Sequence, residues 1–388
     1  MHETYNILIT MLLALLGTLW IHPKILKIAI LKNIVDNPDA RKLQRNPVPV
    51  LGGLAVFFGI VIGICSSQAM FNTPGVFMLM AAMLIMLYIG TIDDVLGLTP
   101  TLRFVIEILV VLWLIYVNEA SINSLWGLFG VNSIPAWAAV PLTVFAAVGI
   151  INAINLIDGV NGLSSGFCFM ASVLFAIIFY VSGNERMTIM AVAAAGAIIP
   201  FFLHNVFGNR TRMFIGDGGT LMIGIMMSMF VISVLTKGSD SAALANKGFG
   251  LVPFTLAVLA VPVFDTLRVM STRIMKGHSP FSPDKTHLHH MFISLGFSHI
   301  GTTVSILTLN FLVVLAWFVS CLLGAPVEVQ LLIVLVLGIS ITFLFYMFAE
   351  KQLKKGGKGL ERLKKISKTM NYEKKGIWTK VQELVDKL

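Results

Sequence analysis

Charged residues are scarce in this 388-residue chain, where Asp, Glu, Lys and Arg together make up 12% of the sequence and hydrophobic residues 57%. Mean hydropathy is +0.88, which excludes a soluble globular protein of ordinary composition and indicates a polytopic membrane protein. Cys65, Cys168 and Cys321 all lie in apolar stretches, which excludes a disulfide framework or a cysteine zinc site. The sequence also shows no long soluble domain, no internal repeat and no low-complexity segment.

Long apolar stretches are what the chain has instead. A helix of roughly 17 to 25 apolar residues is long enough to cross the hydrocarbon core of a bilayer. By this criterion we predict an all-α polytopic protein with about eleven transmembrane helices. Their predicted ranges are 5–22, 48–66, 75–92, 102–117, 134–157, 164–182, 187–207, 214–236, 250–272, 301–323 and 328–349.

Basic residues are distributed very unevenly among the loops. The loops after even-numbered spans hold only Arg186, Lys237 and Lys247, whereas nearly all other Lys and Arg follow odd-numbered spans or lie in the C-terminal tail. The positive-inside rule therefore places the N-terminus outside and the C-terminus in the cytoplasm. The first span lacks a basic flank and a cleavage site, so we do not predict a cleaved signal peptide.

The C-terminal tail carries most of the net charge of +9. Residues 351–388 hold 12 basic and 4 acidic residues, with apolar residues at helical spacing near the end. We predict two parts: a catalytic membrane domain, 1–350, and a basic amphipathic cytoplasmic tail, 351–388, that binds anionic lipid and is separable from the chemistry. A disordered, solvated tail is the alternative, and nothing in the sequence suggests nucleic-acid binding.

Four acidic residues are predicted to end or begin spans on the cytoplasmic face: Asp93, Asp94, Asp158 and Asp217. Any one of them could be only a helix cap or a loop residue. Together, beside apolar spans, they indicate a functional site. Carboxylate oxygens suit Mg²⁺, which typically takes one or two of them plus substrate phosphates and water.

Other polar residues are predicted to lie near these acids. Asn152 and Asn155 share a helix face with Asp158, as phosphate or sugar contacts or alternatively as interhelical hydrogen-bonding residues. The segment 216–219 is glycine-rich, and the amides of a helix start favour anions.

A histidine loop and a basic loop complete the set. His287, His289 and His290, with Lys285 nearby, are interpreted as contacts to a substrate phosphate or sugar, and a transition-metal site is the alternative. In the basic stretch 41–45, Arg45 is a candidate phosphate contact.

Taken together, these stretches resemble the polyprenyl-phosphate N-acetylhexosamine-1-phosphate transferase superfamily. Within it, the segment from Pro280 to His290 and the eleven predicted spans are similar to the branch that transfers N-acetylglucosamine-1-phosphate. The elements that carry the resemblance occur in the family's order, and they are 35–38, 49–53, 93–94, 152–162, 214–219 and 287–290.

The resemblance implies a reaction and roles for these residues. Lipid phosphate would attack the β-phosphorus of UDP-N-acetylglucosamine, releasing UMP. Asp217 would bind Mg²⁺, with Mn²⁺ as an alternative, and Asp93 and Asp94 would bind metal or deprotonate the lipid. Asp158 would be a further catalytic acid, sometimes cast as a nucleophile, and Phe214 would stack on uracil.

The resemblance also implies a setting and leaves alternatives open. The expected partners are a UDP-sugar, undecaprenyl phosphate and the bacterial inner membrane, with the active site on the cytoplasmic face and a homodimer left open. Many members have an acid shortly after the Asp pair, where this chain has 95–97, and Asp in place of Asn161, so neither position is an essential metal ligand here. Another UDP-N-acetylhexosamine, the muramoyl-pentapeptide nucleotide, and a proton-coupled transporter are the alternatives.

Overall fold

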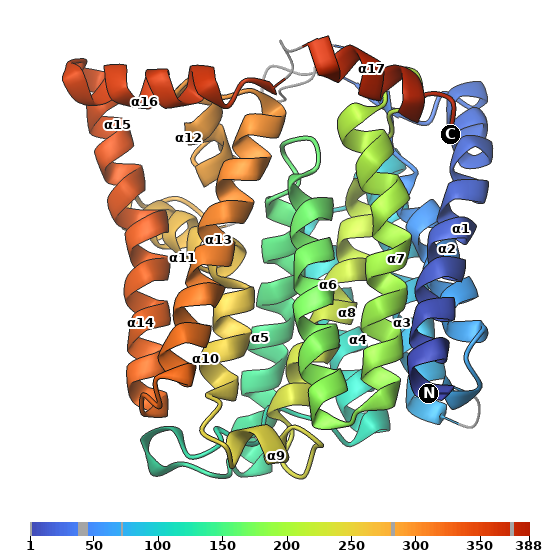
Figure 1. Cartoon of the computed structure of the whole chain (residues 1–388), viewed down its shortest axis with the longest axis vertical. Helices are drawn as coiled ribbons and strands as arrows, with labels where there is room; N and C mark the ends of the chain where they lie inside the picture. The colour runs from blue at the N-terminus through green and yellow to red at the C-terminus, as the bar shows by residue number, and fades with distance from the viewer. Residues whose placement is uncertain (1, 38–45, 71–72, 281–283, 373–375) are drawn as a thin grey trace.

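The computed structural model describes residues 2–37, 46–70, 73–280, 284–372 and 376–388. The chain forms a helical bundle with the N-terminus at one end and the C-terminus at the other (Figure 1). The described part contains two strands, β1 (Val35–Asp36) and β2 (Val48–Pro49), which pair antiparallel over two residues. The nearly all-helical, apolar architecture expected from the sequence is therefore confirmed.

Nine helices in the described part are long and apolar enough to span a membrane. They are residues Thr4–Leu31 of α1 (His2–Leu31), α3 (Pro74–Leu96), α4 (Pro100–Asn118), α5 (Ala136–Leu156), α6 (Leu163–Ser182), α7 (Glu185–Phe207), α8 (Gly216–Leu235), α13 (His299–Leu322) and Val327–Lys355, which joins α14 (Val327–Ile339), η3 (Ser340–Leu344) and α15 (Phe345–Lys355). The remaining helices are α2 (Gly52–Cys65), η1 (Gln68–Met70), η2 (Leu128–Gly130), α9 (Ala242–Ala245), α10 (Leu251–Val258), α11 (Ala260–Met275), α12 (Leu288–Ser294), α16 (Lys358–Thr369) and α17 (Gly376–Val385).

The predicted span at 48–66 is shorter in the structure than in the sequence analysis. Its first residues form β2 and a turn, so α2 keeps only 14 residues, fewer than the roughly 17 that a crossing helix usually needs. Counting the α10–α11 pair as one bent span gives up to ten in the described residues. The count of eleven and the sidedness of the termini stay predictions.

The predicted span at 250–272 is broken, with α10 and α11 bent by 75°. Pro262 has no N–H to donate to the carbonyl of Val258 one turn earlier, and its ring crowds that oxygen. The Asn310 side chain of α13 replaces the missing partners: it donates to Val258 O at 3.0 Å and accepts from the Val261 N–H at 2.9 Å. A break inside an apolar span is tolerated here because another helix satisfies the freed backbone groups.

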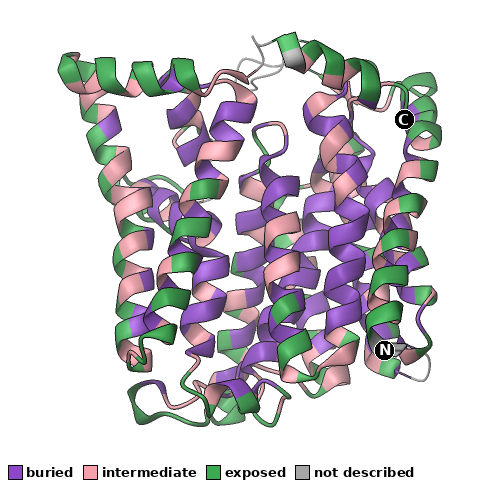
Figure 2. Cartoon of the chain, viewed as in Figure 1, coloured by how far each residue is buried: buried purple, intermediate pink, exposed green. Residues whose placement is uncertain are grey.

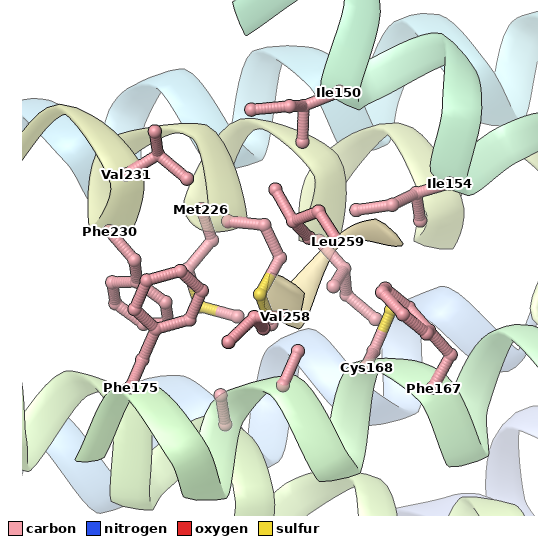
Figure 3. Packing of buried hydrophobic residues seen from close by; sticks show 14 of the residues in the cluster. Ile150, Ile154, Phe167, Cys168, Phe175, Met226, Phe230, Val231, Val258 and Leu259 are labelled. Carbon is pink, nitrogen blue, oxygen red and sulfur yellow. The ribbon is translucent and has the colours of Figure 1, made fainter. Parts of the chain in front are cut away.

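Helix α8 lies at the centre of the bundle and packs on α3 and α5. Its sequence is apolar on all faces, as expected of a buried helix, and 94% of its most apolar window is buried, against 17% for α1. Burial is concentrated in this central region and exposure on the outer helices (Figure 2). Figure 3 shows part of the core, where Phe175 of α6 and Phe230 of α8 lie 5.5 Å apart between ring centroids.

Two local features fix the N-terminus of α8. Gly90 of α3 and Gly218 lie so close that a Cβ on Gly90 would overlap backbone atoms of α8. On the other side, the Phe214 N–H donates to Pro49 O at 2.7 Å, and the Gly52 N–H donates to Phe214 O at 2.9 Å. The start of α8 is thus held between α3 and the 49–53 segment.

The C-terminal tail is helical in its described residues, which corrects the alternative of a disordered tail. Helices α16 and α17 lie across the end of the bundle that carries the C-terminus, nearly perpendicular to the other helices (Figure 1). Leu360 and Leu363 of α16 pack against the core.

Candidate active site

A polar cavity of about 700 Å³ lies at the same end of the bundle, around the start of α8. This volume is within the range of small-molecule binding sites. Its walls come from segments far apart in sequence, including the ends of α3 and α7, the α5–α6 turn and α17. Six of the residues selected from the sequence line it: Asp93, Asp94, Asp158, Phe214, Asp217 and His290.

Asp94 receives backbone hydrogen bonds from the first turn of α8. Its carboxylate accepts from the N–H groups of Asp217, at 3.1 Å, and Gly218, at 3.3 Å. The start of α8 therefore already holds an anion, and this anion is the Asp94 side chain. The sequence analysis noted that the amides of a helix start favour an anion, and in the structure two of these amides donate to the Asp94 carboxylate.

Asp217 points its carboxylate into the cavity from the first turn of α8. One oxygen accepts from the Asn155 side-chain amide at 2.7 Å, and Asn155 also donates to the Thr220 hydroxyl at 2.9 Å. The side chain of Asp217 remains 37% exposed, which leaves oxygen lone pairs open to the cavity. Asn155 does not line the cavity, so it acts on this site by orienting Asp217.

Arg103, in the first turns of α4, joins two of these acids. Its guanidinium lies 3.2 Å from Asp93 Oδ2 and 3.4 Å from Asp217 Oδ2, and its Nε lies 3.5 Å from Glu107 Oε1. Glu107 is buried, one turn further along α4. The sequence analysis did not select Arg103 or Glu107. A charged pair spaced i, i+4 inside an apolar span is the signal that would have found them.

Asn152 lies behind this ion-pair network. Its amide donates to Glu107 Oε2 at 2.5 Å and to Val148 O at 2.9 Å, and its oxygen accepts from Arg103 at 3.4 Å. It is not among the residues that line the cavity. The geometry favours the interhelical hydrogen-bonding interpretation, with Asn152 holding Glu107 and Arg103 in place.

Asp158 lies in the α5–α6 turn, beside the cavity. Desolvation within the cavity raises the pKa of its carboxyl to about 6, a hydrogen bond from the Ser164 hydroxyl acts in the opposite direction, and the charge of Asp217 raises it further. The side chain is exposed to water in the cavity, and this water limits how far desolvation raises the pKa of Asp158. The Asp158 carboxyl thus changes protonation near pH 6.

The three histidines have different surroundings. His287 is buried, and its Nδ1 lies 3.0 Å from Asp265 Oδ2; Arg268 donates to the same carboxylate at 2.7 Å. Arg268 also donates to Thr286 O at 2.6 Å. His287 therefore connects the loop to α11 through Asp265. The same carboxylate is a buried partner for Arg268, which lies in an apolar span.

The rings of His289 and His290 lie with centroids 4.3 Å apart, tilted by 44°, and of the three histidines only His290 lines the cavity. Burial, followed by the nearby charges of His287 and Lys285, lowers the pKa of His290 to about 4. Burial and the neighbouring histidines lower the pKa of His289 well below its ordinary value. Both rings are neutral at pH 7 and offer hydrogen bonds without positive charge. Lys285 is exposed and does not line the cavity.

Several cavity residues were not selected from the sequence. Asp36 and Asn161 lie inside the motifs that carried the family resemblance, whereas Trp378 and Gln382 come from the tail that was assigned to lipid binding. Arg45 lies outside the described residues. The other unselected polar residues on the cavity wall are Asn46, Asn205, Arg212 and His299.

The carboxylates fit a hard divalent cation better than a transition metal. Within the described residues, no three His, Cys, Asp or Glu side chains converge as a metal cluster, which leaves the histidine metal site without support. Mg²⁺ does not need such a cluster, because it uses one or two carboxylates and completes its shell with phosphates and water. Asp217 and Asp93, held side by side by Arg103, are a donor set of this kind.

The fold and the cavity together define a multi-pass membrane protein with an acid-rich polar site at one end of its bundle. A family model described as glycosyl transferase family 4 matches residues 76–235. A probable undecaprenyl-phosphate N-acetylglucosaminyl 1-phosphate transferase of Bacillus subtilis strain 168 is 30% identical over 336 residues, which cover 86% of this chain and 89% of that protein. The chain belongs to glycosyl transferase family 4, which confirms the family inferred from the motifs.

Two enterobacterial relatives agree with this assignment. The undecaprenyl-phosphate alpha-N-acetylglucosaminyl 1-phosphate transferase of Escherichia coli strain K12 is 29% identical over 283 residues, covering 70% of this chain and 72% of that protein. The protein of the same name from Salmonella typhi is 28% identical over 281 residues, with the same coverage. The chain is therefore a membrane-embedded sugar-phosphate transferase.

Proposed function

We propose that this protein transfers N-acetylglucosamine-1-phosphate from UDP-N-acetylglucosamine to undecaprenyl phosphate and releases UMP. The observation that carries the proposal is the acid-rich cavity at the end of a membrane-spanning bundle. A water-soluble nucleotide sugar and a lipid phosphate can meet only at such a boundary. The names of the three relatives support the donor sugar and the lipid.

The acids of the cavity are matched to phosphoryl transfer. This reaction depends mainly on positioning and on neutralising charge, which fixed polar groups and a metal supply. Asp217 and Asp93 would hold Mg²⁺, whose chemistry when bound is to neutralise charge on the donor diphosphate. Asp94 holds the start of α8 in place, so we assign it a positioning role instead of a metal-binding one.

Bond changes in the proposed reaction are simple. An oxygen of the lipid phosphate forms a bond to the β-phosphorus of the donor, the bond from that phosphorus to the bridging oxygen breaks, and UMP leaves with that oxygen. Asp158 in its ionised form would orient the reacting groups, or attack first in a two-step variant. Arg212 and neutral His290 would contact phosphate oxygens, and Phe214, whose backbone is hydrogen-bonded on both sides, would stack on uracil.

The decisive test measures UMP release by the purified protein in undecaprenyl phosphate micelles with Mg²⁺ and one UDP-sugar at a time. We expect lipid-dependent UMP release with UDP-N-acetylglucosamine, complete loss with a chelator, and restoration by Mg²⁺. Release with a different UDP-N-acetylhexosamine or with the muramoyl-pentapeptide nucleotide alone would change the donor. If the folded protein releases no UMP with any donor, the proposed function is wrong and the transporter alternative replaces it.

The pKa of Asp158 predicts a pH dependence. As the pH falls through about 6, Asp158 gains a proton, and we expect kcat/KM to fall about tenfold per pH unit below that value. The Ser164 hydroxyl stabilises the ionised carboxylate, so Ser164→Ala should raise the pKa of Asp158 and move this acidic limb to higher pH. The measurement is the pH profile of kcat/KM for both proteins.

The lipid phosphate itself titrates near pH 6, so the Ser164 comparison is the control that separates the two groups. Ser164 is buried and does not line the cavity, so its loss does not touch the substrate directly. An acidic limb at the same pH in both proteins would assign the limb to the lipid phosphate and remove Asp158 as its origin.

A further inference from the structure

The last helix of the tail, α17, forms part of the cavity wall. Trp378 and Gln382 both line the cavity. They are four residues apart on one helix, so they lie on the same face, one turn from each other. The sequence analysis assigned this helix to the lipid surface, and the structure gives its inner face a different neighbour.

Burial along α17 agrees with this orientation. Val385 is 3% exposed, on the same side of the helix as Trp378 and Gln382, whereas Lys380 and Leu384 are exposed. Part of the amphipathic stripe, including Val385 and the half-buried Trp378, therefore faces the protein, while Leu384 and Leu388 of the same stripe stay exposed.

Two contacts hold α17 against the end of α7. The Trp378 ring lies 5.0 Å from the Phe207 ring between centroids. At the other end, the Asp386 carboxylate accepts from three consecutive backbone N–H groups, those of Asn209 at 2.9 Å, Arg210 at 3.2 Å and Thr211 at 3.3 Å, and from the Thr211 hydroxyl at 3.0 Å. Consecutive amides of this kind form an anion-binding concavity, and here a side chain of the tail occupies it.

The segment that holds Asp386 continues directly into the cavity. Residues 209–211 are followed by Arg212 and Phe214, which line the same cavity as Trp378 and Gln382. The docking site of α17 and the cavity wall are thus adjacent parts of one segment.

We infer that α17 is a wall of the donor pocket and that Trp378 and Gln382 contact the nucleotide of the bound UDP-sugar; this rests on the proposed function. An indole offers a flat face for stacking on a base, and a carboxamide offers both a donor and an acceptor, which match the imide of uracil. The isoprenoid of the acceptor needs an apolar path instead, whereas the cavity that Gln382 lines is also lined by the polar Asn205 and Arg212.

The test compares Trp378→Ala and Gln382→Ala with Lys380→Ala, an exposed position on the outer face of the same helix. Stacking of a base on an aromatic ring is worth about a five- to hundredfold change in affinity. We expect the KM for UDP-N-acetylglucosamine to rise about tenfold in Trp378→Ala and less in Gln382→Ala, with little change in kcat or in the KM for the lipid. Calorimetric titration with UMP should show the same loss of affinity without turnover, Trp378→Phe should recover most of it, and Lys380→Ala should match the unmodified protein.

Other outcomes have distinct meanings. If both cavity-side variants keep the donor KM and the UMP affinity, the inference is wrong. If only the lipid KM or vesicle binding changes, α17 serves the membrane and the inference is again wrong. Should Trp378→Ala fail to fold, Gln382→Ala decides alone, because Gln382 is half-buried and the ring contact with Phe207 belongs to Trp378. Failure of the proposed function would look different, since the unmodified protein would then neither turn over UDP-sugars nor bind UMP.

Discussion

Asp217→Asn is expected to reduce turnover by about a thousandfold or more while leaving the protein folded, a loss comparable to that of removing a main charge-stabilising group from an active site. Asn has the shape of Asp but lacks the charge that binds Mg²⁺. The Asn155 amide can still donate to the side-chain oxygen of the substituted residue, and the lost ion pair with Arg103 is long, at 3.4 Å, and partly exposed. Turnover, Mg²⁺ dependence and the melting temperature of the purified variant check this expectation.

A matched control is Asp240→Asn, which removes an exposed acid from the turn between α8 and α9, at the opposite end of α8. We expect Asp240→Asn to keep normal turnover and normal Mg²⁺ dependence. Near-normal turnover in Asp217→Asn would exclude Asp217 as a metal ligand and would leave Asp93 as the proposed ligand.

The sequence predicted the helical class and identified most of the acids that line the cavity, because both features give strong local signals in the sequence. Long apolar runs are unambiguous, and carboxylates beside them are rare enough to stand out. What the sequence could not supply is the direction in which each carboxylate points. Asp93 and Asp94 are adjacent in sequence, yet one pairs with Arg103 and the other holds the backbone of α8.

One error and one omission of the sequence analysis have clear physical causes. The span at 48–66 was predicted too long because hydropathy cannot show that Pro49 and Gly52 hydrogen-bond across to Phe214 instead of continuing a helix. The lipid-binding tail stays a prediction, and the sequence could not show that one face of α17 also lines the cavity, because an amphipathic stripe indicates only that one face of a helix is apolar. Whether lipid or protein covers that face depends on a tertiary contact, here the one between Asp386 and residues 209–211.

Arg103 was missed because a single cation at the start of an apolar span looks like a topology signal. Its replacement by Met is expected to destabilise the protein by about 3 kcal/mol, since the buried Glu107 and two further carboxylates would lose their shared counterion. Turnover should also fall strongly, because Asp93 and Asp217 would repel each other and move apart. Unfolding in mixed micelles and UMP release measure the two effects.

The double variant Arg103→Met with Glu107→Gln separates these effects. Gln keeps a side-chain oxygen to accept the 2.5 Å hydrogen bond from Asn152 but removes the buried charge, so we expect it to recover part of the lost stability. It should not recover turnover, because the repulsion between Asp93 and Asp217 remains. Recovery of both would mean that Arg103 acts on the site only through the fold. Recovery of neither would mean that the orientation of Asp93 and Asp217, and not the burial of Glu107, dominates the role of this arginine.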